Sequence, residues 1–102
     1  MNNYKKLSND EIQKELVRIS KWDIKKNKLH REYEFSNFVQ AFGFMSQVAL
    51  VAEKLDHHPE WSNIYKNVEI NLTTHAANGI TDFDFKLAAS IENIYSSQVN
   101  KN

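Results

Sequence analysis

Residues 68–88, with the sequence VEINLTTHAANGITDFDFKLA, change from one hydrophobic period to another within a few residues. In the first part apolar residues alternate with polar ones, which predicts a strand with one buried face. After a turn at NGIT, Thr81 and Asp84 form a capping-box pattern, which predicts the start of a helix. The inward residues are Val68, Ile70, Leu72 and Thr74 on the strand, and Leu87, Ala88, Ile91, Ile94 and Tyr95 on the helix.

The segment before this strand predicts another helix and another strand. Ser36 is a candidate N-cap for the helix, and Pro59 forbids its continuation. Gly43, inside the helix, suggests a close contact with a neighbouring helix, since glycine costs about 1 kcal/mol relative to alanine there. The strand follows Pro59 and ends in a turn at residues 66–67. The predicted inward face of the helix is Phe38, Phe42, Met45, Ala49, Ala52 and Leu55.

The first third of the chain predicts a helix and a β-hairpin. Ser8 and Glu11 form a capping box at the start of a helix from about Asn9 to Ile19. A turn at KKNK, residues 25–28, then separates two short runs with a period of two. The apolar residues of these runs are Trp22, Ile24, Leu29, Tyr33 and Phe35.

The elements follow one another in the order α-β-β-α-β-β-α, and the fold class is α+β. Four short alternating strands should form one antiparallel sheet with a wet face, and the helices should pack on the other face. A chain of 102 residues suffices for a single domain, which we expect to span residues 1–102. The polar end, from about residue 97 to 102, should fray.

Composition excludes several classes of function. Thirteen basic and thirteen acidic residues cancel, so no excess charge points to nucleic acid or an anionic membrane. The run VALVA, residues 48–52, is too short to span a bilayer. The start, MNNYKKLSNDE, does not have the pattern of a secretory leader, and we expect a cytoplasmic protein. The absence of cysteine rules out disulfides and thiolate chemistry.

Three histidines lie where predicted elements end. His57 and His58, in LDHHPEW (residues 55–61), follow the second helix, and His75 follows the strand that begins at Val68. One such histidine alone is usually a solvated surface residue, but three of them make a shared pocket plausible. Three histidines could bind zinc, although the pair lacks the H-x-x-x-H spacing. They could equally act as acids and bases, and their spacing does not decide between the two.

Neighbouring polar residues also admit two interpretations. Asp84 can serve as a helix cap or as part of the pocket. Glu53, four residues before His57, would share a helix face with it, although an exposed carboxylate is the commoner case. Trp61 can belong to the core or to the wall of the pocket. His30, within the first hairpin, is interpreted as a surface residue.

The motifs together resemble those of the pterin-4a-carbinolamine dehydratases. The similarity runs from FGFMSQVALVAEKLDHHPEW through IYKNVEINLTTH to GITDFDFKLAASIE. It rests on E-K-x-x-H-H-P-x-W, then T-H, then G-[IL]-T-x-x-D-x-x-L-A. The motifs cover about half of the chain, and the order of elements extends the likeness over most of it. Two departures concern substrate contacts. Ala76, Ala77 and Asn78 stand where the family usually has an acidic or polar residue and a glycine-rich turn, and Phe83 stands where a basic residue is common in the animal members.

The resemblance implies a hydro-lyase without metal or other cofactor. Its substrate would be a 4a-hydroxytetrahydropterin, the spent cofactor of aromatic amino acid hydroxylases, and its product the quinonoid dihydropterin. The implied catalytic residues are His57, His58 and His75. The implied substrate-binding residues are Glu53, Asp56, Pro59, Trp61, Thr74 and Asp84.

Other functions remain open beside the dehydratase. Animal members of the family also act as dimerisation cofactors of a homeodomain transcription factor, so a protein-binding role is the main alternative. A histidine-metal hydrolase is the third, disfavoured by the ligand spacing. We expect a homodimer or homotetramer, because an open four-stranded sheet leaves edges that a second copy can cover. We expect neither a nucleic acid nor a membrane as a direct partner.

Overall fold

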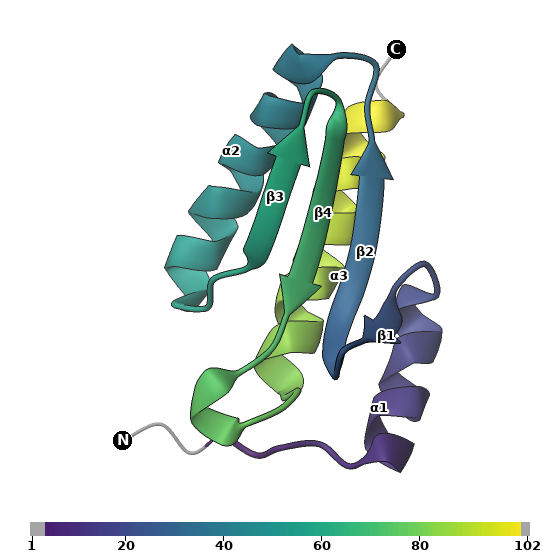
Figure 1. Ribbon diagram of the computed structural model, residues 1–102, viewed down its shortest axis with the longest axis vertical. Coiled ribbons are helices and arrows are strands. Elements are labelled where there is room, and N and C mark those ends of the chain that lie inside the picture. Colours follow the sequence, from purple (N-terminus) through teal and green to yellow (C-terminus); the bar gives the residue numbers. More distant parts are fainter. Residues whose placement is uncertain (1–3, 101–102) are drawn as a thin grey trace.

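The computed structural model describes residues 4–100, and these fold in the predicted order (Figure 1). The helical elements are α1 (Asn9–Leu16), the 3-10 turn η1 (Val17–Ile19), α2 (Phe38–Leu55), the 3-10 turn η2 (His75–Ala77) and α3 (Asp82–Val99). The strands are β1 (Asp23–Lys25), β2 (Lys28–Glu34), β3 (Glu60–Ile64) and β4 (Asn67–Leu72). The α+β class and the α-β-β-α-β-β-α order are therefore confirmed.

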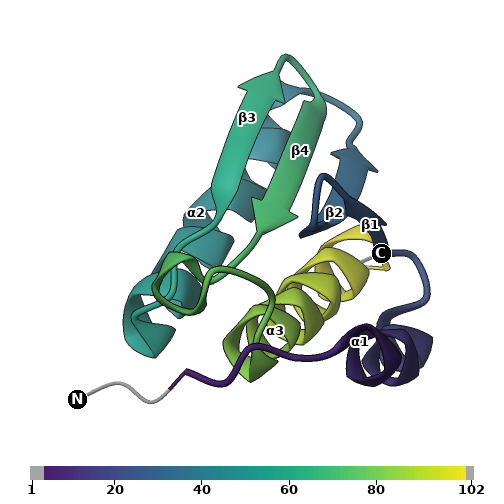
Figure 2. The ribbon, with the colours of Figure 1, turned by 60° about the horizontal axis from the view of Figure 1, so that its bottom comes forward.

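The four strands form one antiparallel sheet in the order β1-β2-β4-β3. The three helices lie on one side of this sheet, as Figure 2 shows from a second direction. Strand β4 is central, and its residues Val68, Ile70 and Leu72 point into the core, as predicted. Strand β4 is followed by η2 and then by α3, so the end of β4 and the start of α3 lie at the same end of the sheet.

Helix α2 differs from its predicted orientation. Asn37, not Ser36, is the N-cap, and its side chain accepts a hydrogen bond from the Gln40 backbone N–H. The buried face consists of Ala41, Phe44, Val48 and Ala52. Of the residues predicted to face inward, Phe38, Phe42 and Ala49 are exposed. Gly43 has open space around it and marks no close contact with any other part of residues 4–100. The helix is apolar on two sides, so its pattern alone did not fix which side meets the sheet.

Two boundaries also differ from the expected ones. The β3–β4 turn lies at Tyr65 and Lys66, one residue earlier than predicted, with Tyr65 in the left-handed conformation at φ 53°. Helix α3 continues to Val99, so residues 97–99 of the expected tail belong to the last turn of this helix. The last two residues of the expected tail, 101–102, lie outside the described part of the chain.

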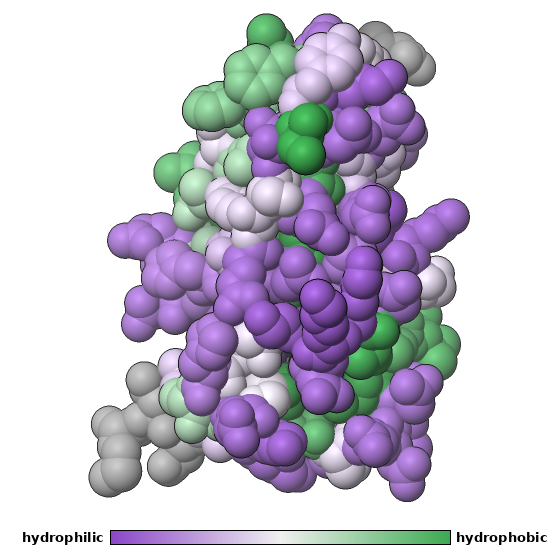
Figure 3. Space-filling view, viewed as in Figure 1, coloured by the Kyte–Doolittle hydropathy of each residue, from purple (hydrophilic) through white to green (hydrophobic). Residues whose placement is uncertain are grey.

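The face of the sheet opposite the helices is mostly hydrophilic (Figure 3). Glu32, Glu69 and Ser62 lie side by side across β2, β4 and β3 on this face. The predicted wet face is therefore present. Within residues 4–100 no helix is both long enough and apolar enough to cross a membrane.

Candidate functional site

The end of α2 directs its two histidines to different environments. Asp56 closes the helix in the left-handed conformation, at φ 52° and ψ 43°, and its backbone N–H donates to the carbonyls of Ala52 and Glu53. This reversal and the following Pro59 prevent another helical turn. His57 consequently turns inward and is 8% exposed, whereas His58 remains at the surface.

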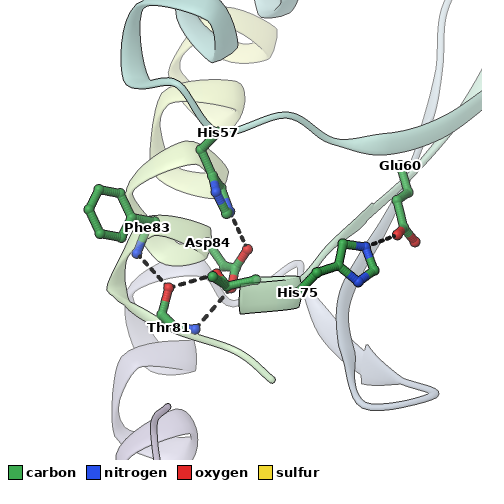
Figure 4. A network of polar contacts seen from close by, with 7 residues as sticks. His57, Glu60, His75, Thr81, Phe83 and Asp84 are labelled. Carbon is green, nitrogen blue, oxygen red and sulfur yellow. Dashed lines mark hydrogen bonds and ion pairs between the residues drawn. The ribbon is translucent and has the colours of Figure 1, made fainter. Parts of the chain in front are cut away.

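His57 forms a buried contact with Asp84, the third residue of α3 (Figure 4). Its Nε2 lies 2.6 Å from Oδ1 of Asp84, and the Asp84 side chain is fully buried. The other carboxylate oxygen, Oδ2, accepts hydrogen bonds from the Thr81 backbone N–H at 2.9 Å and the Thr74 hydroxyl at 2.8 Å. Asp84 is therefore both the predicted helix cap and a partner of a candidate catalytic histidine.

The hydroxyl protons of this network have one consistent arrangement. Because the Thr74 hydroxyl donates to Asp84, its oxygen accepts from the Thr81 hydroxyl, 2.8 Å away. The Thr81 oxygen in turn accepts from the Phe83 backbone N–H. No buried side-chain polar atom of the described residues lacks a partner. The network is fully satisfied, which is the condition for a buried polar group to hold a single geometry.

The hydrogen bonds of Asp84 also indicate which ring nitrogen of His57 carries a proton. An ionised carboxylate can only accept, so Nε2 of His57 carries the proton that it shares with Asp84. Nδ1 has no hydrogen-bond partner among residues 4–100, in which every buried side-chain polar atom has one. Nδ1 must therefore reach the surface of the molecule. His57 presents a nitrogen that can accept a proton there.

The two exposed histidines repeat this pairing with other carboxylates. Nε2 of His58 lies 2.9 Å from Oε1 of Glu53, and Nε2 of His75 lies 2.8 Å from Oε2 of Glu60. Glu53 is exposed, which was the commoner case expected for it, and the reversal at Asp56 brings His58, not His57, beside its carboxylate. Each of the three histidines is oriented by one carboxylate and has Nδ1 left for other contacts.

Glu60 is a site residue that sequence reasoning missed. Its hydrogen bonds with Lys28 and His75 hold the pKa of its carboxyl below the ordinary value. Glu60 therefore remains an ionised acceptor for His75 at neutral pH. Its contacts bridge 32 and 15 positions in sequence, so no local spacing could have revealed them. Only the pairing of β3 with β4 brings Glu60 to this end of the sheet.

One shallow depression of about 250 Å³ collects the candidate residues. It is lined by Tyr4, Asp56, His57, His58, Thr73, Thr74, His75 and Ala76. Glu53 and Asp84 contact it through His58 and His57. Trp61 lies in β3, half-buried against the core, and neither Trp61 nor Pro59 is among the lining residues. Tyr4 and Thr73 were not anticipated, since an N-terminal segment and a strand end have no distinctive spacing.

Phe83 packs against two residues that line this depression. Its ring lies 6.0 Å from the His57 ring and 5.1 Å from the Tyr4 ring. This aromatic residue therefore places an apolar ring beside His57, the partner of Asp84. A low dielectric around a charged hydrogen bond strengthens it.

The structure also shows which residues could hold a metal ion. Among residues 4–100, the donor atoms that lie within 4.8 Å of one another belong to His30, Glu32 and Glu69. These residues lie on the open face of the sheet and include none of the three site histidines. His30, interpreted as a surface residue, is 6% exposed and contacts the Asn71 side chain at 2.8 Å.

Comparison with known proteins gives a consistent result. The sequence profile of the family described as pterin 4 alpha carbinolamine dehydratase matches residues 5–94. A protein of Chelativorans sp., provisionally named pterin-4-alpha-carbinolamine dehydratase, is 50% identical over 95 residues, which are 91% of this chain and 96% of that protein. A protein of Solibacter usitatus with the same provisional name is 54% identical over 87 residues, 85% and 92% of the two chains.

A solved structure extends the likeness to three dimensions. The crystal structure of a protein from Brucella melitensis, called a transcriptional coactivator/pterin dehydratase, is similar with a TM-score of 0.86 and 41% identity. The match covers 88% of this chain and 98% of that one. Fold, motifs and sequence agree over nearly the whole length, and the chain belongs to the pterin-4a-carbinolamine dehydratase family.

Proposed function

We propose that this protein catalyses the dehydration of a 4a-hydroxytetrahydropterin to the quinonoid dihydropterin. In this reaction the bond between carbon 4a and the hydroxyl oxygen breaks and N5 loses its proton. A double bond forms between carbon 4a and N5, and water leaves. The observation that carries the proposal is the buried His57–Asp84 pair beside the exposed His75–Glu60 pair, with both histidines lining one depression.

The chemistry needs an acid and a base that act near neutral pH. Imidazole can do both, because its ordinary pKa is about 6.5. The acid protonates the poor leaving group, and the base takes the proton of N5. We assign these steps to His57 and His75, whose Nδ1 atoms are not used by Asp84 and Glu60. Each carboxylate stabilises the imidazolium that forms when its histidine gains a proton.

The remaining polar residues of the depression are suited to holding the pterin. A pterin presents an amino group and ring N–H groups, which donate hydrogen bonds to carboxylates. Asp56 is exposed and lines the depression, and Glu53 contacts His58, which also lines it. We assign these two carboxylates and His58 to substrate binding, together with Thr74, whose hydroxyl belongs to the Asp84 network. The cellular role would be recycling of the cofactor of an aromatic amino acid hydroxylase in the cytoplasm.

Dehydration is expected to survive exhaustive chelation. Each site histidine is held by its own carboxylate through Nε2, and the close donor set of the described residues lies elsewhere. Formation of the quinonoid dihydropterin can be followed by absorbance, before and after treatment with a chelator. Equal rates support acid–base catalysis by the histidines. Loss of activity that zinc restores would instead show that dehydration depends on a metal ion.

A homodimer is expected to be the smallest stable form, and a tetramer is compatible with the same surfaces. The N-terminal half of α2 exposes Phe38, Val39 and Phe42, the last of which is 57% exposed. Such clusters of large apolar side chains mark protein contacts. Phe42→Glu should therefore shift the protein toward monomer at micromolar concentration in light scattering, while Gln47→Glu, a substitution at an exposed polar position of the same helix, should not. A wild-type monomer would refute this expectation.

A protein-binding role is the second candidate function. The Brucella melitensis neighbour is called a transcriptional coactivator as well as a pterin dehydratase. In this chain the exposed apolar residues of α2 supply a surface for such a role, separate from the histidine depression. A variant with Phe42→Glu would separate the two functions, because it alters that surface and leaves the histidines in place.

A further inference from the structure

A second hollow adjoins the histidine depression. It has a volume of about 340 Å³ and is lined by Lys6, Lys26, Asn27, Lys28, Thr73, His75, Asn78 and Gly79. Thr73 and His75 line both spaces. A ligand that binds at the histidines and is too large for the histidine depression can therefore extend past His75 into this hollow.

The three lysines of this hollow come from separate parts of the chain. Lys6 precedes α1, Lys26 lies in the β1–β2 turn, and Lys28 begins β2 (Figure 1). Because Leu29 pairs with Leu72, the start of β2 lies beside the end of β4 and the residues that follow it. The convergence is therefore a product of the fold and not of a basic run in the sequence.

Gly79 gives Lys6 its place at the hollow. A Cβ atom at position 79 would lie 2.7 Å from Cε of Lys6 and 3.0 Å from its Cγ. The aliphatic part of Lys6 thus lies directly over the glycine backbone. Any larger residue at position 79 would require the Lys6 side chain to shift.

The charges of the hollow are not balanced. Lys28 contacts Glu60 at 2.5 Å and is neutralised by it. Lys6 and Lys26 are exposed and form no ion pair with another described residue, and no acidic side chain lines the hollow. Two positive charges therefore face this space without a negative partner. Such a concave surface attracts anions.

We propose that this hollow binds an anionic group at the end of the pterin's side chain, so that the preferred substrate is a 4a-hydroxytetrahydropterin carrying a phosphate or a carboxylate at the substituent of carbon 6. The proposal rests on the proposed function, because it places the pterin ring at the histidines. Lys6 and Lys26 then act as specificity-determining residues. The asparagine side chains of Asn27 and Asn78 can donate further hydrogen bonds to the anion.

Binding of oxidised pterins, which cannot be dehydrated, tests the proposal without relying on turnover. Calorimetry would compare 6-hydroxymethylpterin, its phosphate ester and pterin-6-carboxylate. We expect at least one anionic ligand to bind about three- to tenfold more tightly than the neutral one at low salt, and the tighter of the two identifies the source of the charge. The preference should shrink at 1 M salt, where the screening length falls to about 3 Å.

The double variant Lys6→Gln/Lys26→Gln should remove this preference. Lys14→Gln is the matched control, because Lys14 is an exposed residue of α1 that does not line the hollow. This variant should retain the preference for anionic pterins. Equal affinity of wild-type protein for the neutral and anionic pterins, or a preference that survives the double variant, overturns the proposal. Dehydration without charge preference would overturn this inference alone. Charge preference without dehydration would support the anion-binding hollow, and would refute the proposed reaction and with it the assignment of a preferred substrate.

Discussion

Asp84→Asn is expected to lower kcat for dehydration by about 10²–10⁴-fold while the protein remains folded. An asparagine at this position can keep its oxygen toward Thr81 and Thr74, which both donate to Oδ2 of the aspartate. Its NH₂ group then faces Nε2 of His57, which must become an acceptor. The proton of His57 moves to Nδ1, and the nitrogen at the depression loses its basic lone pair.

The role of Asp84 in this account is to position His57, so the test needs more than activity. Nitrogen NMR of His57 should show the Nε2–H tautomer in the wild-type protein and the Nδ1–H tautomer in the variant. Asp82→Asn is the matched control, because Asp82 is an exposed residue of the same first turn of α3. Thermal unfolding would check that both variants fold. Full activity of Asp84→Asn together with an unchanged tautomer would reduce Asp84 to a helix cap.

The second large effect concerns the two faces of the pterin. Carbon 4a is tetrahedral, so its hydroxyl projects from one face of the nearly flat ring or from the other. His57 approaches the depression from the end of α2, and His75 approaches it from η2, after the end of β4 (Figure 4). We expect each histidine to protonate the hydroxyl on its own face. A single imidazole cannot easily reach both.

His57→Ala and His75→Ala should therefore impair the two 4a stereoisomers unequally, each variant slowing most the isomer whose hydroxyl the missing histidine protonates, by about 10²–10⁴-fold. His58→Ala should weaken the binding of both isomers, because His58 is assigned to holding the ring. Single-turnover rates with the separated stereoisomers provide the measurement. If both alanine variants slow the two isomers by one common factor, the assignment of one histidine to each face is wrong.

Much of the fold was predictable because its signals are local. The change of period between Val68 and Leu87 depends only on side-chain alternation and on the capping box of Thr81 and Asp84, and the structure contains both. Helix α2 was less predictable. Phe42 and Phe44 are both large and apolar, and only the position of the sheet decides that Phe44 is fully buried while Phe42 is 57% exposed.

The sequence predicted which histidines lie together, but not which carboxylate contacts each of them. His57, His58 and His75 do line one depression, as their places at the ends of elements suggested. The carboxylate that holds each one could not be read from spacing. Asp84 reaches His57 across 27 positions, through the packing of the α3 N-terminus against the end of α2. Glu53 contacts His58 and not His57 because Asp56 adopts the left-handed conformation, which cannot be recognised from composition.

The rate of water loss from a 4a-hydroxytetrahydropterin in the presence of a chelator tests the central claim most directly. Stopped-flow absorbance would compare the uncatalysed reaction, the wild-type protein and a folded His57→Ala/His75→Ala double variant. We expect the wild-type protein to accelerate dehydration strongly and the double variant to return it close to the uncatalysed rate. A wild-type protein that gives no acceleration, or a double variant as fast as the wild type, would contradict histidine-catalysed dehydration at this site.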